Sequence, residues 1–287
     1  MRYEVAKSFA YASELLLAEP GKTMVLAGGT DVLVQLKLGL SEPDLLVDIK
    51  QIAESKSIEK TSNGYRIGAA VSGAALGENQ DICGDWPGVV EAMELIGSTQ
   101  IQGRATLVGN LCNASPAADS VPALMAAGAS VEVVSASGVR QILVKDLPKS
   151  PGKTVLAKGD IISAVLLPPR LNNAADAYLR FIPRTEMDIA VASAGVNLEL
   201  DVDGIVRNAQ VALGAVAATI SLVKDASTAL LGSKLDDASL KNLAAACAAA
   251  CSPINDRRGT IEFRTKIAGV LACRAAKIAY QRAGGSQ

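Results

Sequence analysis

The chain has 287 residues, of which 49% are apolar, and its 28 lysines and arginines nearly balance 29 aspartates and glutamates. This length and apolar content suffice for one large domain or two ordinary ones, which excludes a disordered chain. The formal charge of -1 gives no electrostatic support for binding nucleic acid or anionic lipid. The absence of histidine excludes Ser-His-Asp and Cys-His nucleophiles and any zinc site that uses imidazole. The chemistry is therefore expected from a bound cofactor, or from carboxylates, lysines and backbone amides.

The five cysteines indicate a reducing compartment, because they are odd in number and scattered along a chain that can fold without disulfides. Cys247 and Cys251 lie four residues apart in an alanine-rich segment. A metal or cluster pair is one interpretation, but without further ligands two small core residues are favoured. The N-terminal segment is charged and lacks the apolar core of an export signal, and no apolar stretch reaches the roughly 20 residues that span a bilayer. We expect a cytoplasmic protein that binds neither membrane nor nucleic acid.

The first 55 residues read as a strand, glycine turn and helix unit. The expected elements are a helix at 8–18, a strand at 24–27, a helix at 32–38 and a strand at 45–49. Gly28 and Gly29 end the first strand, and Thr30 or Asp31 can cap the helix that follows.

The pattern is mixed from residue 58 to about residue 169. The expected strands are 65–67, 130–134, 141–144 and 161–167, and the expected helices are 87–95 and 122–127. A turn-rich block, 100–119, separates these two helices. Two prolines at 168–169 followed by two asparagines at 172–173 mark the expected domain boundary.

The remaining residues, 173–287, place strands before helices. The expected strands are 177–182, 189–200 and 206–213, and the expected helices are 221–231, 238–250 and 259–281. A hairpin turn at 202–204 joins the second and third strands. This order suggests an α+β domain with helices on one face of an antiparallel sheet.

The common nucleotide-binding motifs are missing. Two Gly-Lys-Thr triplets, at 21–23 and 152–154, resemble the end of a P-loop, but Leu16 and Leu147 stand where the first P-loop glycine is required. GxGxxG is absent too, so a Rossmann dinucleotide site lacks its fingerprint.

The segment Ala27-Gly28-Gly29-Thr30-Asp31 has the outline of a phosphate cradle. Paired glycines let backbone N–H groups approach a ligand, and a helix opens directly afterwards with its positive dipole end toward the same place. An ordinary strand-to-helix turn is the alternative interpretation.

The segment Thr106-Leu107-Val108-Gly109-Asn110, within a run of small polar residues, is the second candidate. Its N–H and hydroxyl donors could bind a diphosphate, and an ordinary loop is again the alternative. Two glycine loops in one domain, neither of them a P-loop, favour an extended cofactor held at two points.

These segments, with two more motifs, carry a resemblance to a known family. The motifs, in order, are 27–32, 101–110, ASPAAD at 114–119 and RTEMDIA at 184–190, and NDRRGTIEFR at 255–264 adds a C-terminal signature. The chain resembles the FAD-binding medium subunits of molybdenum hydroxylases, the family of the carbon monoxide dehydrogenase and xanthine dehydrogenase types. The resemblance covers essentially the whole chain.

The resemblance implies an α+β protein with a vanillyl-alcohol-oxidase/PCMH-type FAD-binding domain at 1–172. This domain would consist of two α/β subdomains, at about 1–55 and 56–172. A C-terminal α+β domain at 173–287, an antiparallel sheet with helices, would help to close over the flavin.

The resemblance also implies the residues that bind FAD. Backbone donors of one segment would wrap the diphosphate: Leu26, Ala27, Gly28, Gly29, Thr30, Asp31 and Val32. Thr106, Gly109 and Asn110 would hold it from the other side. Asp119 would accept hydroxyls of the adenosine half. Ile162 would line the cofactor, Arg180 would stand near the flavin, and Ile189 would pack close to the ring.

One residue departs from the family pattern: Val108 stands at the first glycine of the usual TIGGN. Its side chain either faces away from the loop surface or pushes the loop back from the diphosphate. Asp256, Arg258 and Arg264 in the C-terminal signature are interpreted as a salt-bridged helix start.

The implied function is that of the FAD-carrying electron-transfer subunit of a heterotrimeric molybdenum-containing hydroxylase or dehydrogenase. A large subunit would carry the molybdenum cofactor and a small subunit two [2Fe-2S] clusters, in an (LMS)2 assembly. Electrons would pass from the clusters to FAD and then to an external acceptor. Five scattered cysteines cannot supply the roughly eight thiolates of two clusters, so this chain should carry flavin and no metal, with no catalytic side chain for the organic substrate. A stand-alone FAD oxidoreductase of the same fold and a non-catalytic assembly factor are the alternatives; only Val108 favours the latter.

Overall fold

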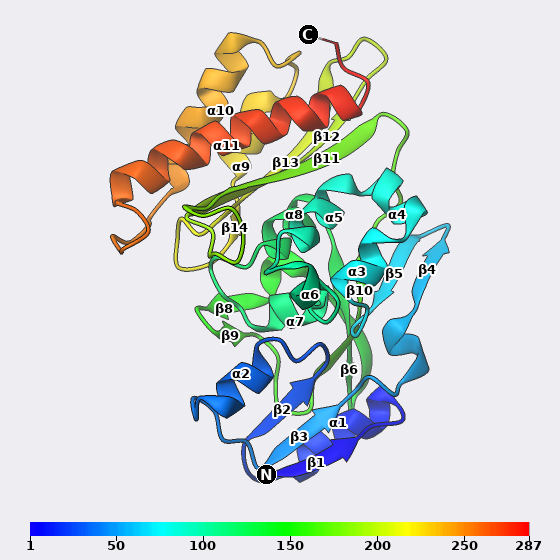
Figure 1. The fold of residues 1–287 in the computed structure, drawn as a ribbon. Helices are drawn as coiled ribbons and strands as arrows, with labels where there is room; N and C mark the ends of the chain where they lie inside the picture. The colour runs from blue at the N-terminus through cyan, green and yellow to red at the C-terminus, as the bar shows by residue number, and fades with distance from the viewer. Residues whose placement is uncertain (287) are drawn as a thin grey trace.

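The computed structural model describes residues 1–286 and arranges them around three main sheets that follow one another along the molecule (Figure 1). The N-terminal sheet lies at one end, a five-stranded sheet lies in the middle, and the C-terminal sheet lies at the other end with its helices outermost. A fourth, two-stranded sheet, β8 (Pro148–Ser150) with β9 (Lys153–Thr154), lies beside the middle region.

The first region is a three-stranded parallel sheet in the order β1-β3-β2. Its elements are β1 (Arg2–Val5), α1 (Phe9–Ala18), β2 (Thr23–Leu26), α2 (Val32–Lys37), β3 (Leu45–Asp48) and the 3-10 turn η1 (Ala53–Lys56). Helix α1 begins where the sequence predicts, because the Ser8 hydroxyl accepts the N–H of Tyr11. Strand β1 was not expected, since its residues are mostly exposed and two of them are charged.

The middle region is a five-stranded antiparallel sheet in the order β4-β5-β10-β6-β7. Its strands are β4 (Ile58–Thr61), β5 (Gly64–Gly68), β6 (Ser130–Ser135), β7 (Gly138–Leu143) and β10 (Ile161–Leu167). Its helices are α3 (Gly73–Gly77), α4 (Gln80–Asp85), α5 (Pro87–Glu94), α6 (Thr99–Gln102), α7 (Leu107–Cys112) and α8 (Ser120–Ala126), with the 3-10 turn η2 (Val144–Asp146).

The prediction that residues 100–119 form turns is wrong in part, because most of α6 and all of α7 lie inside this block. Helix α7 is only six residues long and contains a glycine, so it carries too few apolar positions to show a helical period. Its start is fixed locally instead, where the Thr106 hydroxyl accepts the N–H of Gly109 at 2.9 Å.

The third region is a four-stranded antiparallel sheet in the order β11-β12-β13-β14, with helices on one face as predicted. Its elements are β11 (Ala174–Phe181), β12 (Ala192–Leu200), β13 (Val206–Gly214), β14 (Ser221–Leu222), α9 (Lys224–Leu230), α10 (Asp237–Ala250) and α11 (Ile261–Arg282). Three expected boundaries differ by three residues. The strand expected from 177 begins at Ala174, and the strand expected from 189 begins at Ala192. The helix expected from 221 begins at Lys224, because Ser221 and Leu222 pair with β13.

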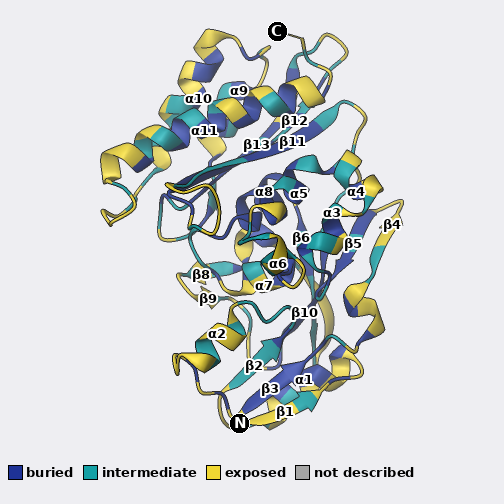
Figure 2. Ribbon diagram, viewed as in Figure 1, coloured by how far each residue is buried: buried dark blue, intermediate teal, exposed yellow. Residues whose placement is uncertain are grey.

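The buried residues, dark blue in Figure 2, lie along the sheets and the helices that cover them. Their side chains form two clusters, one mainly within the first two regions and one between the third sheet and its helices. Helix α8 is buried along its whole length and contacts β12 and β13, so it joins the middle region to the third sheet. No helix within residues 1–286 has the length and hydropathy that crossing a bilayer requires.

Candidate functional site

The glycine turn after β2 lies against the loop that leads into α7. Arg104 donates from Nε to the carbonyl of Gly28 at 3.4 Å. A Cβ placed on Gly28 would lie 1.8 Å from the carbonyl oxygen of Arg104 and 3.2 Å from the Cα of Ala105. Only glycine lets the two backbones approach this closely. The structure therefore brings together the two segments that the sequence singles out.

The first of these segments leaves backbone donors free for a ligand. Gly29 has a φ of +85°, a left-handed conformation that favours glycine. Within the described chain, the N–H groups of Gly28, Gly29 and Thr30 have no backbone acceptor. Asp31 begins α2 without capping it, and its carboxylate accepts Gln35 Nε2 at 2.7 Å instead. A turn of adjacent unpaired N–H groups fits the needs of a diphosphate.

The second segment is fixed by its own side chains. Thr106 is buried and caps α7, and Asn110 Oδ1 accepts both the N–H and the hydroxyl of Ser120, at 3.2 and 2.7 Å. Val108 is 6% exposed and belongs to the main core. Its side chain therefore faces away from the loop surface, the first of the two possibilities, and the loop keeps its position beside Gly28.

Asp119 joins the first two regions to the third sheet. Its Oδ1 accepts the hydroxyl of Tyr178 and its Oδ2 accepts Arg180 Nη1, both at 2.7 Å. Tyr178 and Arg180 are two apart on β11 and so share one face of the strand. Burial raises the pKa of Asp119 to about 6, and the charge of Arg180 with the two hydrogen bonds offsets only part of that rise. The Arg180 side chain is 4% exposed, and its Nε has no partner within residues 1–286.

The apolar candidates lie at different depths. Leu26 and Ile162 are 7% and 3% exposed, so Ile162 forms part of the core at a bulge of β10. Ala27 and Val32 are half-buried. Ile189 is 50% exposed, beside Met187, which has a φ of +54° and is 54% exposed. The loop carrying Ile189 therefore offers apolar surface to a ligand or partner.

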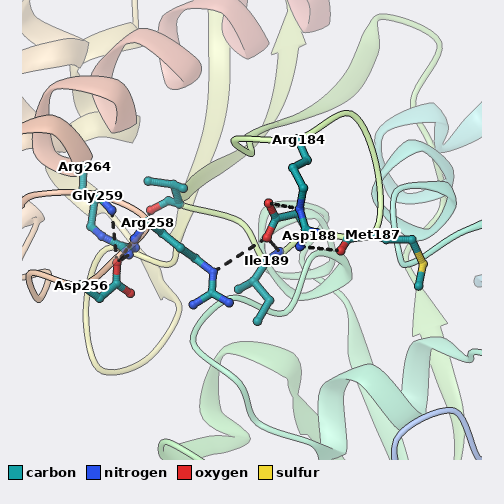
Figure 3. A network of polar contacts seen from close by, with 9 residues as sticks. Arg184, Met187, Asp188, Ile189, Asp256, Arg258, Gly259 and Arg264 are labelled. Atoms are coloured by element: carbon teal, nitrogen blue, oxygen red, sulfur yellow. Dashed lines mark hydrogen bonds and ion pairs between the residues drawn. The ribbon is translucent and has the colours of Figure 1, made fainter.

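The loop 184–190 is held by charged residues that include the C-terminal signature (Figure 3). Asp188 accepts Arg184 Nε at 3.1 Å and lies 3.9 Å from Arg258 Nε, and the Arg184 hydrogen bond keeps the pKa of Asp188 below its usual value. Asp256 Oδ1 accepts the N–H groups of Arg258 and Gly259 and, at 2.6 Å, Arg264 Nη2. The salt-bridged helix start predicted for the signature is confirmed.

Cys247 belongs to the core of the third region and Cys251, partly buried, packs against it, in agreement with the interpretation favoured from the sequence. Cys247 is fully buried, and the Cys251 thiol donates to the Cys247 carbonyl at 3.1 Å.

Sequence reasoning missed three residues of this site. Tyr178 could have been found, because strand alternation places it on the same face as Arg180. Ser120 directly follows Asp119 but gave no separate signal. Arg104 contributes through its backbone carbonyl, which no side-chain pattern reveals, and through its Nε, which donates to the Gly28 carbonyl.

The fold and the site define an α+β protein in which a glycine turn with free N–H groups lies against a second segment, beside a buried Asp119–Arg180 pair. The family described as "FAD binding domain in molybdopterin dehydrogenase" matches residues 1–170, and the family described as "CO dehydrogenase flavoprotein C-terminal domain" matches residues 177–279. The chain belongs to this family of FAD-binding molybdopterin dehydrogenase subunits.

Named relatives match nearly end to end. The carbon monoxide dehydrogenase medium chain of Afipia carboxidovorans is 32% identical over 282 residues, 98% of this chain and 97% of the relative. A putative xanthine dehydrogenase FAD-binding subunit of Escherichia coli is 29% identical over 285 residues, 99% of this chain and 97% of the relative. A solved Cu,Mo-CO dehydrogenase, in its cyanide-inactivated form, superposes with a TM-score of 0.93 at 30% identity over 98% of each chain. The predicted fold class is confirmed.

Proposed function

We propose that this chain is the FAD-carrying electron-transfer subunit of a molybdenum-containing hydroxylase or dehydrogenase. It accepts electrons from [2Fe-2S] clusters of a partner and passes them to an external acceptor. Family membership and the nearly full-length match to medium and FAD-binding subunits support this role. FAD supplies the redox chemistry when bound, and the residues of this chain bind and orient it. The observation that carries the proposal is the contact of Gly28 with the Arg104 carbonyl, which places two donor-bearing loops side by side.

The two loops divide the binding of FAD between them. The free N–H groups of Gly28, Gly29 and Thr30 bind the diphosphate, and the first turn of α7, which contains Gly109, faces it from the other side. Leu26, Ala27, Asp31, Val32, Thr106 and Asn110 shape these two loops.

Beyond the diphosphate, three residues complete the site. Both oxygens of Asp119 already accept a hydrogen bond, yet a carboxylate has lone pairs left for an adenosine hydroxyl. Arg180, fixed by Asp119, supplies positive charge near the flavin. Ile162 supports the site from the core.

The proposed partners are a large molybdenum-cofactor subunit and a small [2Fe-2S] subunit, in an (LMS)2 assembly in the cytoplasm. Five scattered cysteines support placing the clusters on another chain. The burial of Val108 removes the feature that favoured a non-catalytic assembly factor.

Purification of the chain alone and with its co-expressed partners tests the proposal. We expect a yellow protein whose visible spectrum shows bound FAD, and whose flavin is bleached when substrate is added to the complex. A colourless chain with no measurable FAD affinity in either preparation would contradict the proposal. Turnover of an organic substrate by the isolated chain would instead establish the stand-alone oxidoreductase.

A further inference from the structure

The C-terminal signature forms a turn that leads into α11. Asp256 organises this turn, because its Oδ1 accepts the N–H groups of Arg258 and Gly259 at 2.8 and 3.2 Å. Asn255 Oδ1 accepts the N–H of Ile261 at 2.7 Å, at the first residue of the helix. Local turn formation thus accounts for these residues, but it does not account for Arg264.

The position of Arg264 is energetically unfavourable for a charged side chain. It is 4% exposed and lies in the first turn of α11, where the helix dipole disfavours a cation. A buried guanidinium is tolerated only where carboxylate and carbonyl oxygens compensate for lost water. Asp256 supplies one partner at 2.6 Å (Figure 3). The other two partners are backbone carbonyls, since Arg264 Nη1 donates to Val191 at 2.8 Å and to Ala215 at 3.1 Å.

The two carbonyls belong to segments that lead to the candidate FAD site. Val191 directly follows the loop 184–190, and its N–H donates to the carbonyl of Phe181 at 2.9 Å, one residue beyond Arg180. Arg264 therefore fixes the end of the loop that carries Ile189.

Ala215 connects Arg264 to the loop that carries Asp119. Its N–H donates to the carbonyl of Pro116 at 2.7 Å, and its φ is +63°. Ala114, in the same loop as Pro116, also has a positive φ, of +49°. Such conformations are strained in a non-glycine residue and persist where surrounding contacts enforce them. The Arg264 contact to the Ala215 carbonyl is one of those contacts.

We propose that Arg264 is a positioning residue of the FAD site, which holds the loops 114–119 and 184–191 together across two regions of the molecule without touching the cofactor. This inference rests on the proposed function, since those loops carry Asp119 and Ile189. Through Arg264, the C-terminal signature thus fixes the relative positions of these two loops.

The test compares Arg264→Leu and Arg264→Lys in the purified full chain, by titration with FAD and by amide hydrogen exchange without FAD. Arg264→Leu is expected to weaken FAD binding by about tenfold and to speed exchange in 114–119 and 184–191. Arg264→Lys should recover part of the affinity, because its ammonium retains the charge and can reach a carbonyl.

Two further variants separate positioning from general stability. Tyr280→Phe removes a 2.7 Å hydrogen bond to the Gly204 carbonyl from the far part of α11 and should lower the unfolding temperature while leaving FAD affinity unchanged. If Arg264→Leu does not fold, Asp256→Asn keeps the turn acceptor but removes the charge facing Arg264. It should weaken FAD binding by about threefold.

The outcomes are distinguishable. A wild-type chain that binds no FAD, either alone or with its co-expressed partners, overturns the proposed function. Wild-type FAD affinity in Arg264→Leu, with unchanged exchange in both loops, overturns the positioning role alone. An equal loss of affinity in Tyr280→Phe also overturns it, because general destabilisation would then explain the effect.

Discussion

The geometry of the site requires that residue 28 has no side chain, because a Cβ on Gly28 would lie 1.8 Å from the Arg104 carbonyl oxygen. Gly28→Ala must push the two loops apart. We expect FAD affinity to fall by about tenfold or more, and the free energy of unfolding to fall by about 1–3 kcal/mol. Fluorescence titration with FAD and urea denaturation measure the two effects.

Gly84→Ala is the matched control for that substitution. Gly84 lies in α4, and a Cβ there would meet nothing within 4 Å. It should leave FAD affinity unchanged and raise stability by up to about 1 kcal/mol, since alanine favours a helix. Equal FAD affinity for wild type and Gly28→Ala would show that the two loops do not bind one ligand together.

The sequence indicated which residues could meet at this site but not how each is used. Paired glycines at 28–29 pointed to a close backbone approach, and the approach exists. Thr106 was expected to help hold the diphosphate, and its hydroxyl also accepts the Gly109 N–H and so caps α7. The sequence did not reveal this capping role, which leaves the hydroxyl proton free to be donated to a ligand.

At the scale of elements, the contact of β12 with α8 requires glycine. A Cβ on Gly195 would lie 2.6 Å from the carbonyl oxygen of Pro122, and backbone atoms cannot yield as a flexible side chain does. Gly195→Ala should therefore lower the free energy of unfolding by about 1–3 kcal/mol, measured by urea denaturation. Asn208→Ala, at an exposed position of neighbouring β13, should change it by no more than about 0.5 kcal/mol. If Gly195→Ala left the free energy of unfolding unchanged, α8 would have to be free to move away from the sheet.

Elements with many apolar positions were predictable, and short or exposed ones were not. Strand β10 and helix α11 have long buried faces, which produce a clear pattern. Strand β4 is mostly exposed and polar, and helix α3 consists of glycine, alanine and leucine in five residues. Such segments adopt their structure because of pairing or packing with distant residues, which the local sequence does not encode.

Across the whole molecule, two buried carboxylates connect the third sheet to the rest. Asp119 binds Tyr178 and Arg180. Asp176, on β11, pairs with Arg170 at 2.5 Å and accepts the N–H of Val89 in α5 at 3.0 Å. Burial is the main cause that raises both pKa values to about 6. Because both carboxylates titrate in this range, the stability of the contact between the third sheet and the other regions depends on pH.

The pH dependence of stability follows from the sign of that shift. Because the folded chain binds the Asp119 proton more tightly than the unfolded chain, the contribution of Asp119 falls as pH rises from about 4 to about 6. We therefore compare the free energies of unfolding of wild type and Asp119→Asn, measured by urea denaturation at each pH. The wild-type value minus the variant value should fall by about 1–3 kcal/mol over this window and then level off. For Asp188→Asn the same difference should not fall and should rise slightly near the acid end, because the hydrogen bond from Arg184 lowers the pKa of Asp188 and the folded chain binds that proton less tightly than the unfolded chain. A flat or rising difference for Asp119→Asn would show that the charge of Arg180 and the hydrogen bonds to Asp119 offset the effect of burial on its pKa.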